Sequence, residues 1–449
     1  MGEYRITGGR RLSGEVAIGG AKNAALPILA AAVLGGRSII HNCPRISDIF
    51  CTLEILTALG CAVSFIGNTV VVDTRGIEPR ALPQELATKM RSSIIFAGGL
   101  LGRFGYAEMA QPGGCKLGKR QIDLHLSALR SLGAVVDVEE GIVHAKADRL
   151  VGADIMLAIP SVGATQNAML AAVMATGTSV IHNAAREPEI VDLQNYLVKM
   201  GAKVAGAGGG KIVVDGLGIS FGTKHLRDAE HSVMPDRIVA GTYMAAAAIT
   251  GGNIRLNRIV YDDIRPTADV LAAGGVEVTV QGDSVEVCAA QRFTAVKRVT
   301  TAPHPGFPTD MQPQISALLA TAAGRSNVVE NIFDSRDRHV AELAKMGANI
   351  LNIGGRHFDI LGVERLHGAT VTAHDLRCGA ALILAGLGAD GKTIVTDSVH
   401  VERGYEGIDA DLRALGADVN LIPDAIPNLI PNSARSSALS QIQTAVLSP

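Results

Sequence analysis

The sequence has no tryptophan, and aromatic residues make up only 3% of its 449 residues. Its apolar fraction of 47% therefore rests mainly on alanine, valine, leucine and isoleucine. These small and branched side chains favour closely stacked helices and strands over aromatic cages. Since single domains commonly run to about 100–200 residues, the length predicts at least two domains.

The chain also lacks an excess of charge of either sign. Its 41 lysines and arginines nearly balance its 43 aspartates and glutamates, for a formal net charge of −2. A protein without a basic field does not hold a polyanion, so nucleic acid is excluded as a partner. Any anionic ligand must be held by a local group of cations.

Paired cysteines are missing as well. The six cysteines form no CxxC pair and no zinc-type spacing, which predicts reduced thiols and no disulfide framework. Three histidines (His41, His304 and His374) have no partner at metal-ligand spacing, and the sequence predicts neither a metal nor a cofactor. The cysteines are Cys43, Cys51, Cys61, Cys115, Cys288 and Cys378.

No apolar run reaches the roughly 20 residues that a membrane span requires. The longest runs are interrupted or short, so they predict core helices and no membrane insertion. Residues 1–20 are polar and basic where a signal peptide would be apolar. We therefore expect a cytoplasmic protein.

One sequence pattern recurs six times: an apolar residue, a glycine and a small residue, followed by alternating apolar and polar residues. Successive glycines lie 73, 68, 73, 73 and 69 residues apart. A glycine just past a helix fits a left-handed cap, and the alternation fits a half-buried strand. Six related units are predicted, each closing with a helix, a glycine and a hairpin. The shared glycines are Gly60, Gly133, Gly201, Gly274, Gly347 and Gly416.

Each unit opens with a strand, a short loop and an apolar helix, so the predicted order is β-loop-α and then β-α-β-β. Three units per half predict two α/β domains of about 200 residues. The chain is expected to cross between them near Gly20–Ala21 and again within residues 226–233. The first domain would span 21–230, the second 1–20 and 231–422, and 423–449 would form a mobile tail. The cleft between the domains is the expected site.

The loop-to-helix junctions of the six units carry the unusual residues. They fall 37–42 residues before the six glycines, and four of them bear a lysine or an arginine. Helix N-termini offer free N–H groups and partial positive charge, which suit an anionic substrate. A single junction of this kind is more often a surface cap, but six in register favour a binding role. The junctions are Lys22, Arg91, Gly163, Arg237, Asp310 and Arg377.

The stretch 111–125, QPGGCKLGKRQIDLH, places Cys115 among glycines and three nearby cations. Cations stabilise a thiolate over a thiol, so Cys115 is a candidate reactive cysteine on a mobile lid. An inert surface cysteine is about equally compatible with these residues. At Asp310, in HPGFPTDMQ, the carboxylate could be a general base or a helix cap. Residues 161–165, SVGAT, could cradle a diphosphate or only cap a helix.

Taken together, GGAKNAALP, PGGCKLGKRQIDLH, SVGAT, MPDRI, FPTDMQ, DLRCGAALILAG and ERGYE resemble the UDP-N-acetylglucosamine enolpyruvyl transferases. The resemblance runs in order from residue 1 to about residue 422. It implies two inside-out α/β domains of three repeated βαβαββ-type units each, with the active site in the interdomain cleft. It also implies transfer of the enolpyruvyl group of phosphoenolpyruvate to the 3-hydroxyl of UDP-N-acetylglucosamine, the first committed step of peptidoglycan synthesis, without a cofactor.

The resemblance further assigns roles to residues. Lys22, Arg120 and Arg403 would hold phosphoenolpyruvate, with Arg91 and Arg377 nearby. Asp310 would be the base and Cys115 the acid, and fosfomycin would alkylate that thiol. Arg336 and Asp375 are further substrate-binding candidates. The nucleotide sugar would meet Asn23, Arg120, Gln121, Ile122, Asp123, Leu124, Ser161, Val162, Gly163, Asp310 and Ile332.

Two departures and two rivals accompany the resemblance. Some relatives carry a lysine where this chain has Pro160, and Asp337 and Arg338 stand where apolar residues are expected. One rival is the shikimate-pathway enolpyruvyl transferase, against which the Cys115 lid and Asn23 argue. The other is a catalytically silent paralogue that binds nucleotide sugar. The oligomeric state stays open between a monomer and a weak homo-oligomer.

Overall fold

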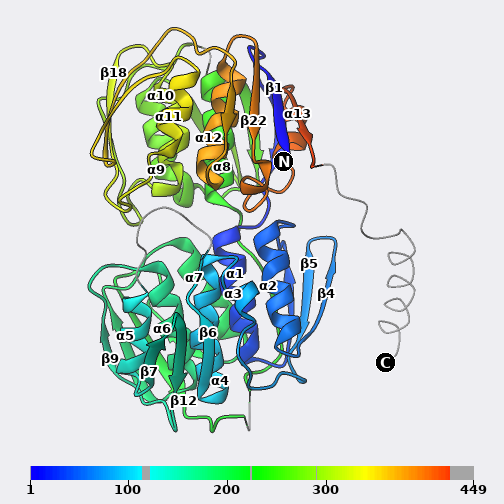
Figure 1. Ribbon diagram of the computed structural model, residues 1–449, viewed down its shortest axis with the longest axis vertical. Helices are drawn as coiled ribbons and strands as arrows, with labels where there is room; N and C mark the ends of the chain where they lie inside the picture. The colour runs from blue at the N-terminus through cyan, green and yellow to red at the C-terminus, as the bar shows by residue number, and fades with distance from the viewer. Residues whose placement is uncertain (1, 114–121, 223–224, 290, 425–449) are drawn as a thin grey trace.

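The computed structural model describes residues 2–113, 122–222, 225–289 and 291–424, which form two α/β domains placed end to end (Figure 1). Cys115, Arg120 and Gln121 lie outside the described residues, as does the predicted tail from residue 425 onward. The two-domain architecture of repeated units expected from the sequence is confirmed.

Three sheets form the outside of the first domain. Each contains an antiparallel hairpin, as the glycine repeat predicts. Their strands, in spatial order, are β13 (Ala229–Ser232), β3 (Arg37–His41), β5 (Thr69–Asp73) and β4 (Ala62–Ile66); β6 (Tyr106–Ala110), β8 (Ile142–Lys146) and β7 (Val135–Glu139); and β11 (Lys203–Ala205), β12 (Lys211–Leu217), β10 (Thr176–His182) and β9 (Asp154–Met156).

Three sheets of four strands each form the outside of the second domain. Two of them contain the predicted hairpins, β15–β16 and β19–β20. The strands, in spatial order, are β15 (Glu277–Gln281), β16 (Ser284–Cys288), β14 (Asn253–Asn257) and β2 (Ser13–Ala17); β17 (Arg298–Thr300), β18 (Arg325–Val329), β20 (His357–Leu361) and β19 (Asn349–Ile353); and β21 (Thr370–Thr372), β22 (Lys392–Thr396), β1 (Glu3–Thr7) and β23 (Asp418–Ile422).

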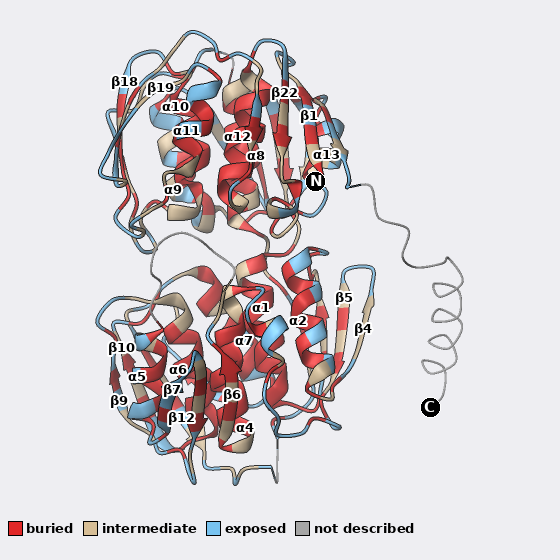
Figure 2. Cartoon of the chain, in the orientation of Figure 1, coloured by how far each residue is buried: buried red, intermediate tan, exposed pale blue. Residues whose placement is uncertain are grey.

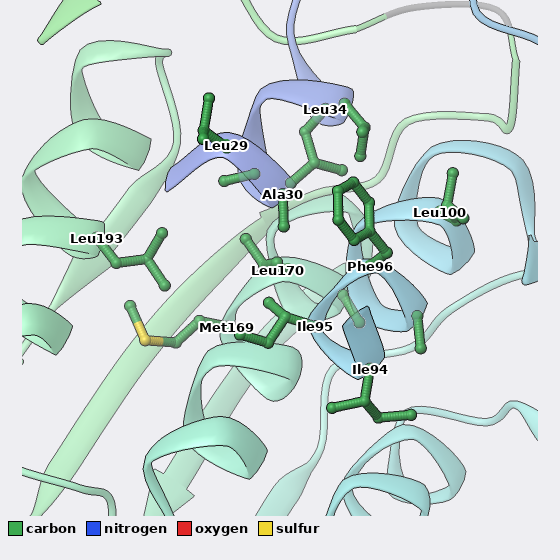
Figure 3. Packing of buried hydrophobic residues seen from close by; sticks show 14 of the residues in the cluster. Leu29, Ala30, Leu34, Ile94, Ile95, Phe96, Leu100, Met169, Leu170 and Leu193 are labelled. Carbon is green, nitrogen blue, oxygen red and sulfur yellow. The ribbon is translucent and has the colours of Figure 1, made fainter. Parts of the chain in front are cut away.

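The helices that follow the six junctions are buried on almost every side, as Figure 2 shows in red. A helix that is apolar all round belongs in an interior, and here the helices lie inside while the sheets lie outside. Figure 3 shows how Leu29, Phe96 and Leu170 of three such helices meet in the first domain. These inner helices are α1 (Lys22–Ala31) with η1 (Ala32–Leu34), η2 (Arg91–Ile95) with α4 (Phe96–Phe104), α6 (Val162–Met174), α8 (Arg237–Thr250), η3 (Thr309–Met311) with α10 (Gln312–Leu319), and α12 (Leu376–Gly388).

A second helix in each unit ends at the repeated glycine. Five of the predicted glycines adopt left-handed conformations with φ between +89° and +98°, namely Gly60, Gly133, Gly201, Gly347 and Gly416. The helices that they end are α2 (Ser47–Ala58), α5 (Asp123–Ser131), α7 (Pro188–Lys199), α11 (Arg338–Lys345) and α13 (Ile408–Ala414).

In the fourth unit the prediction was wrong by one residue. The left-handed position is Gly275, with φ +94°, and Gly274 ends α9 (Tyr261–Ala273) with φ −91°. Gly274 has a packing role instead, because a Cβ built there would lie 2.0 Å from the Phe293 ring. Because two glycines stand in succession here, the sequence pattern does not distinguish which of them is the left-handed residue.

The second unit also departs from the predicted order. No strand precedes its inner helix; the short helix α3 (Gln84–Ala87) stands in that place, and the sheet of this unit has three strands. In the sixth unit the short helix η4 (Ser398–His400) follows β22, and β23 pairs with β1 from the start of the chain, so no local hairpin forms.

At the two crossings the units exchange strands. β2, which precedes α1, pairs in parallel with β14 of the second domain, and β13, which precedes α8, pairs in parallel with β3 of the first. One buried apolar cluster runs from Ala21 to Val233, and the other combines residues from Tyr4 to Ile18 with those from Ile238 to Val419. This division supports domain boundaries near residues 20 and 231, which we propose on that basis.

The five cysteines among the described residues are all free thiols, as expected. Within the same part of the chain, none of the helices combines the length and apolar character needed to cross a membrane.

Candidate active site

All six predicted junctions lie within the first two residues of a helix. Lys22, Arg91 and Arg237 are first residues, of α1, η2 and α8, while Gly163, Asp310 and Arg377 are second residues, of α6, η3 and α12. The repeat therefore delivers charged or small residues to equivalent places in all six units. Four of the six are cations.

Asp236 ties the two crossings of the chain together. Its Oδ2 accepts a hydrogen bond from the backbone N–H of Lys22 at 3.1 Å, and its Oδ1 accepts from Ile238 N at 2.8 Å and Val239 N at 3.0 Å. One buried carboxylate thus caps the starts of both α1 and α8, since Ala21 offers α1 no side-chain cap. The orientation of Lys22 is fixed by a residue from the second crossing.

Asp48, on α2, joins two of the predicted phosphoenolpyruvate ligands. Its Oδ2 lies 2.6 Å from Nζ of Lys22, and its Oδ1 accepts a hydrogen bond from Nε of Arg403 at 2.9 Å. Asp48 belongs to the first domain, whereas Arg403 follows η4 in the second. A carboxylate from one domain therefore holds a cation from the other beside Lys22.

Burial and pairing act in opposite directions on these groups. Burial is the largest effect on Lys22 and lowers the pKa of its ammonium, although Asp48 opposes the shift. Burial by itself would raise the pKa of Asp48, but Lys22 and Arg403 outweigh it and hold that pKa below its ordinary value. Asp48 is therefore an anion at neutral pH, and the two cations are held in place by it.

Other contacts join the domains on either side of this bridge. Arg45 N donates to Glu406 Oε2 at 2.9 Å, and the Arg237 guanidinium donates through Nε to Glu189 Oε1 at 2.9 Å. His304 N donates to Glu187 Oε1 at 3.3 Å. The domains thus meet through carboxylates that accept hydrogen bonds from backbone N–H groups and from one guanidinium, and polar interfaces of this kind allow the domains to move relative to each other.

Asp310 lies between two arginines of the second domain. Its Oδ1 accepts from Nη1 of Arg336 at 2.9 Å, and its Oδ2 accepts from Nη2 of Arg377 at 2.9 Å. Both arginines are 4% exposed, while the Asp310 side chain is 24% exposed. Arg377 also donates to the Tyr405 hydroxyl at 3.3 Å. The sequence did not predict that both carboxylate oxygens would be occupied.

These arginines set the acidity of Asp310. Burial would raise its pKa, but Arg377 and Arg336 reverse that effect and hold the pKa far below the ordinary value. In turn, Asp310 is the main group that raises the pKa of Arg377 against the effect of burial. Asp310 is ionised throughout the neutral range, so it is free of a proton but weakly basic while both arginines remain.

The start of α6 forms a separate polar region in the first domain. Ser161 caps this helix, its Oγ accepting from Ala164 N at 3.4 Å. His125 of α5 packs against Gly163 in the first turn, where a Cβ would lie 2.7 Å from Cε1 of the ring. Arg91 is close enough to lower the pKa of His125. Ser161, Val162, Gly163 and Arg91 thus form one region, as an anion site at a helix start requires.

The other predicted residues make fewer contacts with one another. Asn23 is half-buried beside Lys22, Ile122 is 9% exposed, Asp123 begins α5 and Leu124 is half-buried. Asp375 caps α12 by accepting from Arg377 N at 2.9 Å and Cys378 N at 3.0 Å. Ile332 is 37% exposed and its N–H donates to Glu330. Among the described residues, no side-chain hydrogen bond or ion pair joins Asn23 or Ile332 to another candidate.

The sequence reasoning missed Asp48, Asp236 and His125. Asp236 precedes Arg237 within MPDRI, so its place beside a junction was a usable signal. Asp48 lies in SDIF, at the start of a helix, where an acidic residue is explained by its favourable interaction with the helix dipole. No sequence pattern therefore assigned it to the site. In the described part of the chain, no group of three or more His, Cys, Asp or Glu side chains is placed to hold a metal.

Comparison with known proteins places these features in a family. The EPSP synthase (3-phosphoshikimate 1-carboxyvinyltransferase) family model matches residues 6–412. UDP-N-acetylglucosamine 1-carboxyvinyltransferase 2 of Caldanaerobacter subterraneus subsp. tengcongensis is 47% identical over 93% of this chain and 99% of its own length. The protein of the same name from Carboxydothermus hydrogenoformans is 45% identical over 94% of this chain and 100% of its own.

Two solved structures are similar in fold. The enolpyruvyl transferase NikO from Streptomyces tendae superposes with a TM-score of 0.83 at 26% identity, covering 94% of this chain and 99% of that one. EPSP synthase from Acinetobacter baumannii superposes with a TM-score of 0.71 at 18% identity, covering 94% of this chain and 100% of that one.

Two buried histidines predict how stability depends on pH. Burial lowers the pKa of His125 to about 3 and that of His339 to about 4, whereas an unfolded histidine titrates near pH 6.5. Below about pH 6.5 the unfolded chain binds protons that the folded chain does not, so stability falls as the pH is lowered towards those values. Each ring contributes at most about 1.4 kcal/mol per pH unit.

Urea unfolding from pH 7 to pH 4.5 measures this dependence. We expect His125→Gln and His339→Gln each to make the loss of stability with falling pH shallower than in the wild type. The matched control is His357→Gln, since His357 is exposed on β20. Variants whose pH dependence equals that of the wild type would show that these rings are protonated in the folded protein.

Proposed function

We propose that this chain, which belongs to the UDP-N-acetylglucosamine 1-carboxyvinyltransferase group of the EPSP synthase family, transfers the enolpyruvyl group of phosphoenolpyruvate to the 3-hydroxyl of UDP-N-acetylglucosamine. Phosphate is released, and the step is the first committed one of peptidoglycan synthesis. The observation that carries the proposal is identity of 45–47% over almost the full length of the relatives that bear this name.

The Asp48 bridge supports the place of phosphoenolpyruvate. Lys22 and Arg403 come from different domains and share one carboxylate, so the space beside them suits a small anion that carries both a carboxylate and a phosphate. Phosphoenolpyruvate would take over part of the pairing that Asp48 now provides. Arg120, which lies outside the described residues, completes the proposed cation set, and Arg91 and Arg377 belong to its surroundings.

The start of α6 supports the place of the nucleotide sugar. We assign the diphosphate to Ser161, Val162 and Gly163, because N–H groups and partial positive charge meet there. The uridine is assigned to the run Arg120–Leu124, of which only Ile122, Asp123 and Leu124 are described. The sugar is assigned to a group at the domain junction, namely Asn23, Asp310, Ile332, Arg336 and Asp375.

The proposed reaction is an addition followed by an elimination. Asp310 takes the proton of the 3-hydroxyl as its oxygen attacks C2 of phosphoenolpyruvate, and Cys115 gives a proton to the methylene carbon. The resulting tetrahedral ketal then breaks its bond to the phosphate oxygen, and the departing phosphate takes the proton held by Asp310. The new methyl group returns a proton to the Cys115 thiolate, which restores the alkene and both groups. Arginines stabilise the carboxylate and the phosphate during both steps.

The two arginines on Asp310 place a condition on this mechanism. A carboxylate held by both Arg336 and Arg377 is a poor proton acceptor, because its pKa lies far below neutral. Asp310 becomes an effective base only when one arginine turns to another anion. Phosphoenolpyruvate supplies such an anion next to Lys22, whose pKa is already affected by Arg377. Substrate binding would thus activate the base.

A phosphate-release assay with both substrates tests the activity. We expect phosphate to appear only when phosphoenolpyruvate and UDP-N-acetylglucosamine are both present. Release with shikimate 3-phosphate in place of the nucleotide sugar would instead favour the shikimate-pathway activity, for which the solved relatives are only 18% identical. Nucleotide binding without release would support a silent paralogue.

Replacing the proposed base should slow turnover while preserving shape. Asp310→Asn keeps the size of the side chain but cannot accept a proton, so kcat should fall roughly 10²- to 10⁴-fold. Asp334→Asn is a matched control, because Asp334 pairs with Arg356 at an exposed position in the same region. Near-normal turnover by Asp310→Asn would assign the base to another group.

A further inference from the structure

Glu330 directly follows β18 and is completely buried. Its Oε1 accepts hydrogen bonds from the backbone N–H groups of Ile332 at 2.7 Å and Phe333 at 3.1 Å, and from the hydroxyl of Thr301 at 2.9 Å. Its Oε2 accepts from the hydroxyl of Thr309 at 2.9 Å. A carboxylate is tolerated in an interior only where donors satisfy its oxygens in this way. Glu330 therefore fastens the turn after β18 to the start of η3.

The hydrogen bonds around Thr309 run in one direction. The Arg336 guanidinium has no acceptor atom, so its Nη1 must donate to the Thr309 hydroxyl oxygen, which lies 3.0 Å away. The single proton of that hydroxyl is then left for Glu330, because carboxylate oxygens only accept. The order is Arg336 to Thr309 to Glu330, and successive hydrogen bonds of this kind polarise one another. The negative charge of Glu330 thus acts on Arg336 through one hydroxyl.

Arg336 is shared between Thr309 and Asp310. The Nη1 that donates to Thr309 also donates to Oδ1 of Asp310 at 2.9 Å. The guanidinium lies 4.7 Å from the centre of the Phe333 ring. Arg336 is 4% exposed, and its Nε is buried without a hydrogen-bond partner among the described residues. Losing Asp310 would be costly for so buried a cation unless a second acceptor stayed in place. Thr309 is that acceptor.

The proposed reaction requires Asp310 to gain a proton while two arginines hold it. A protonated carboxyl is neutral and attracts a guanidinium less strongly than a carboxylate does, so each arginine needs another partner as the proton arrives. Arg377 also donates to the Tyr405 hydroxyl, and phosphoenolpyruvate is assigned to its surroundings. For Arg336 the second partner is the Thr309 hydroxyl, which is supported by a full negative charge.

We propose that Glu330, acting through Thr309, keeps Arg336 in place when Asp310 takes the proton of the sugar hydroxyl. The inference rests on the proposed function, in which Asp310 is the base, and it adds Glu330 and Thr309 as positioning residues. Because the second acceptor is present before the reaction begins, Arg336 does not have to reorient during the proton transfer.

Three variants test this role in the phosphate-release assay. Thr309→Val keeps the shape of the side chain but removes the acceptor, Thr309→Ser restores the acceptor, and Glu330→Gln removes the charge. We expect Thr309→Val and Glu330→Gln each to lower kcat roughly 10- to 100-fold, with KM for both substrates changed by less than about threefold. Thr309→Ser should retain most of the activity. The control is Thr321→Val, which removes a half-buried hydroxyl that donates to Leu318 O in the same domain.

A double-mutant cycle with Asp310→Asn separates this role from a general effect on packing. Asp310→Asn has no base for Arg336 to release, so adding Thr309→Val to it should change kcat by less than about threefold. Losses of kcat that multiply would show that Thr309 acts independently of Asp310, and they would overturn the inference. Wild-type kcat in Thr309→Val or Glu330→Gln would overturn it as well.

A crystal structure of Asp310→Asn tests the pairing without any turnover. The neutral amide stands for the protonated carboxyl, and we expect Nη1 of Arg336 to remain hydrogen-bonded to the Thr309 hydroxyl. A guanidinium that has left Thr309 would refute the inference even if Thr309→Val does not fold. Absence of phosphate release by the wild type would instead contradict the proposed function, on which this structural result does not depend.

Discussion

The pairing of Lys22 and Arg403 with the single carboxylate of Asp48 is the interaction on which the proposed site depends. One cation begins the inner helix of the first domain, and the other follows η4 of the second. Neither domain alone could place both charges beside one small anion. Asp48 is the partner that holds them together before a substrate does. Because Lys22 and Asp48 are buried, separating that pair is energetically costly.

The fold explains why cations gather at this place. Each inner helix is apolar on every side, so its body must lie in the interior and its polar start is the part that reaches the domain junction. Where the helix starts need caps, acidic residues such as Asp236 and Asp375 provide them. Arg377, which follows the Asp375 cap, then pairs with Asp310, whereas Arg237, which follows the Asp236 cap, pairs with Glu189. The cations at the helix starts are therefore oriented by carboxylates from other elements.

Much of this arrangement could be predicted from the sequence. The glycine repeat located six units and five of the six left-handed caps. This succeeded because a left-handed helix end needs a glycine for its backbone conformation alone, whatever packs around it. The junction residues were also found, since they stand at a fixed offset from those caps. The error at Gly274 arose because Gly275 follows it directly. Packing of Gly274 against Phe293 determines which of the two glycines takes the left-handed conformation, and no local sequence pattern predicts that contact.

The pairings within the site could not be predicted in the same way. Asp48 and Arg403 are separated by 355 residues, and they meet only where the two domains come together in the folded protein. His125 and Asn167 also meet at 2.7 Å through a hydrogen bond that no spacing in the sequence predicts. The low basicity of Asp310 likewise follows from Arg336 and Arg377, which meet it only in the folded protein.

A double-mutant cycle between Asp48 and Arg403 tests the central claim most directly. Asp48→Asn, Arg403→Gln and the double variant are compared with the wild type by the free energy of unfolding in urea at pH 7. Coupled residues in direct contact give interaction energies of roughly 0.5–3 kcal/mol, and we expect a value in the upper half of that range because the carboxylate is buried. Effects of the two substitutions that add within roughly 0.5 kcal/mol would contradict a bridge that joins the domains.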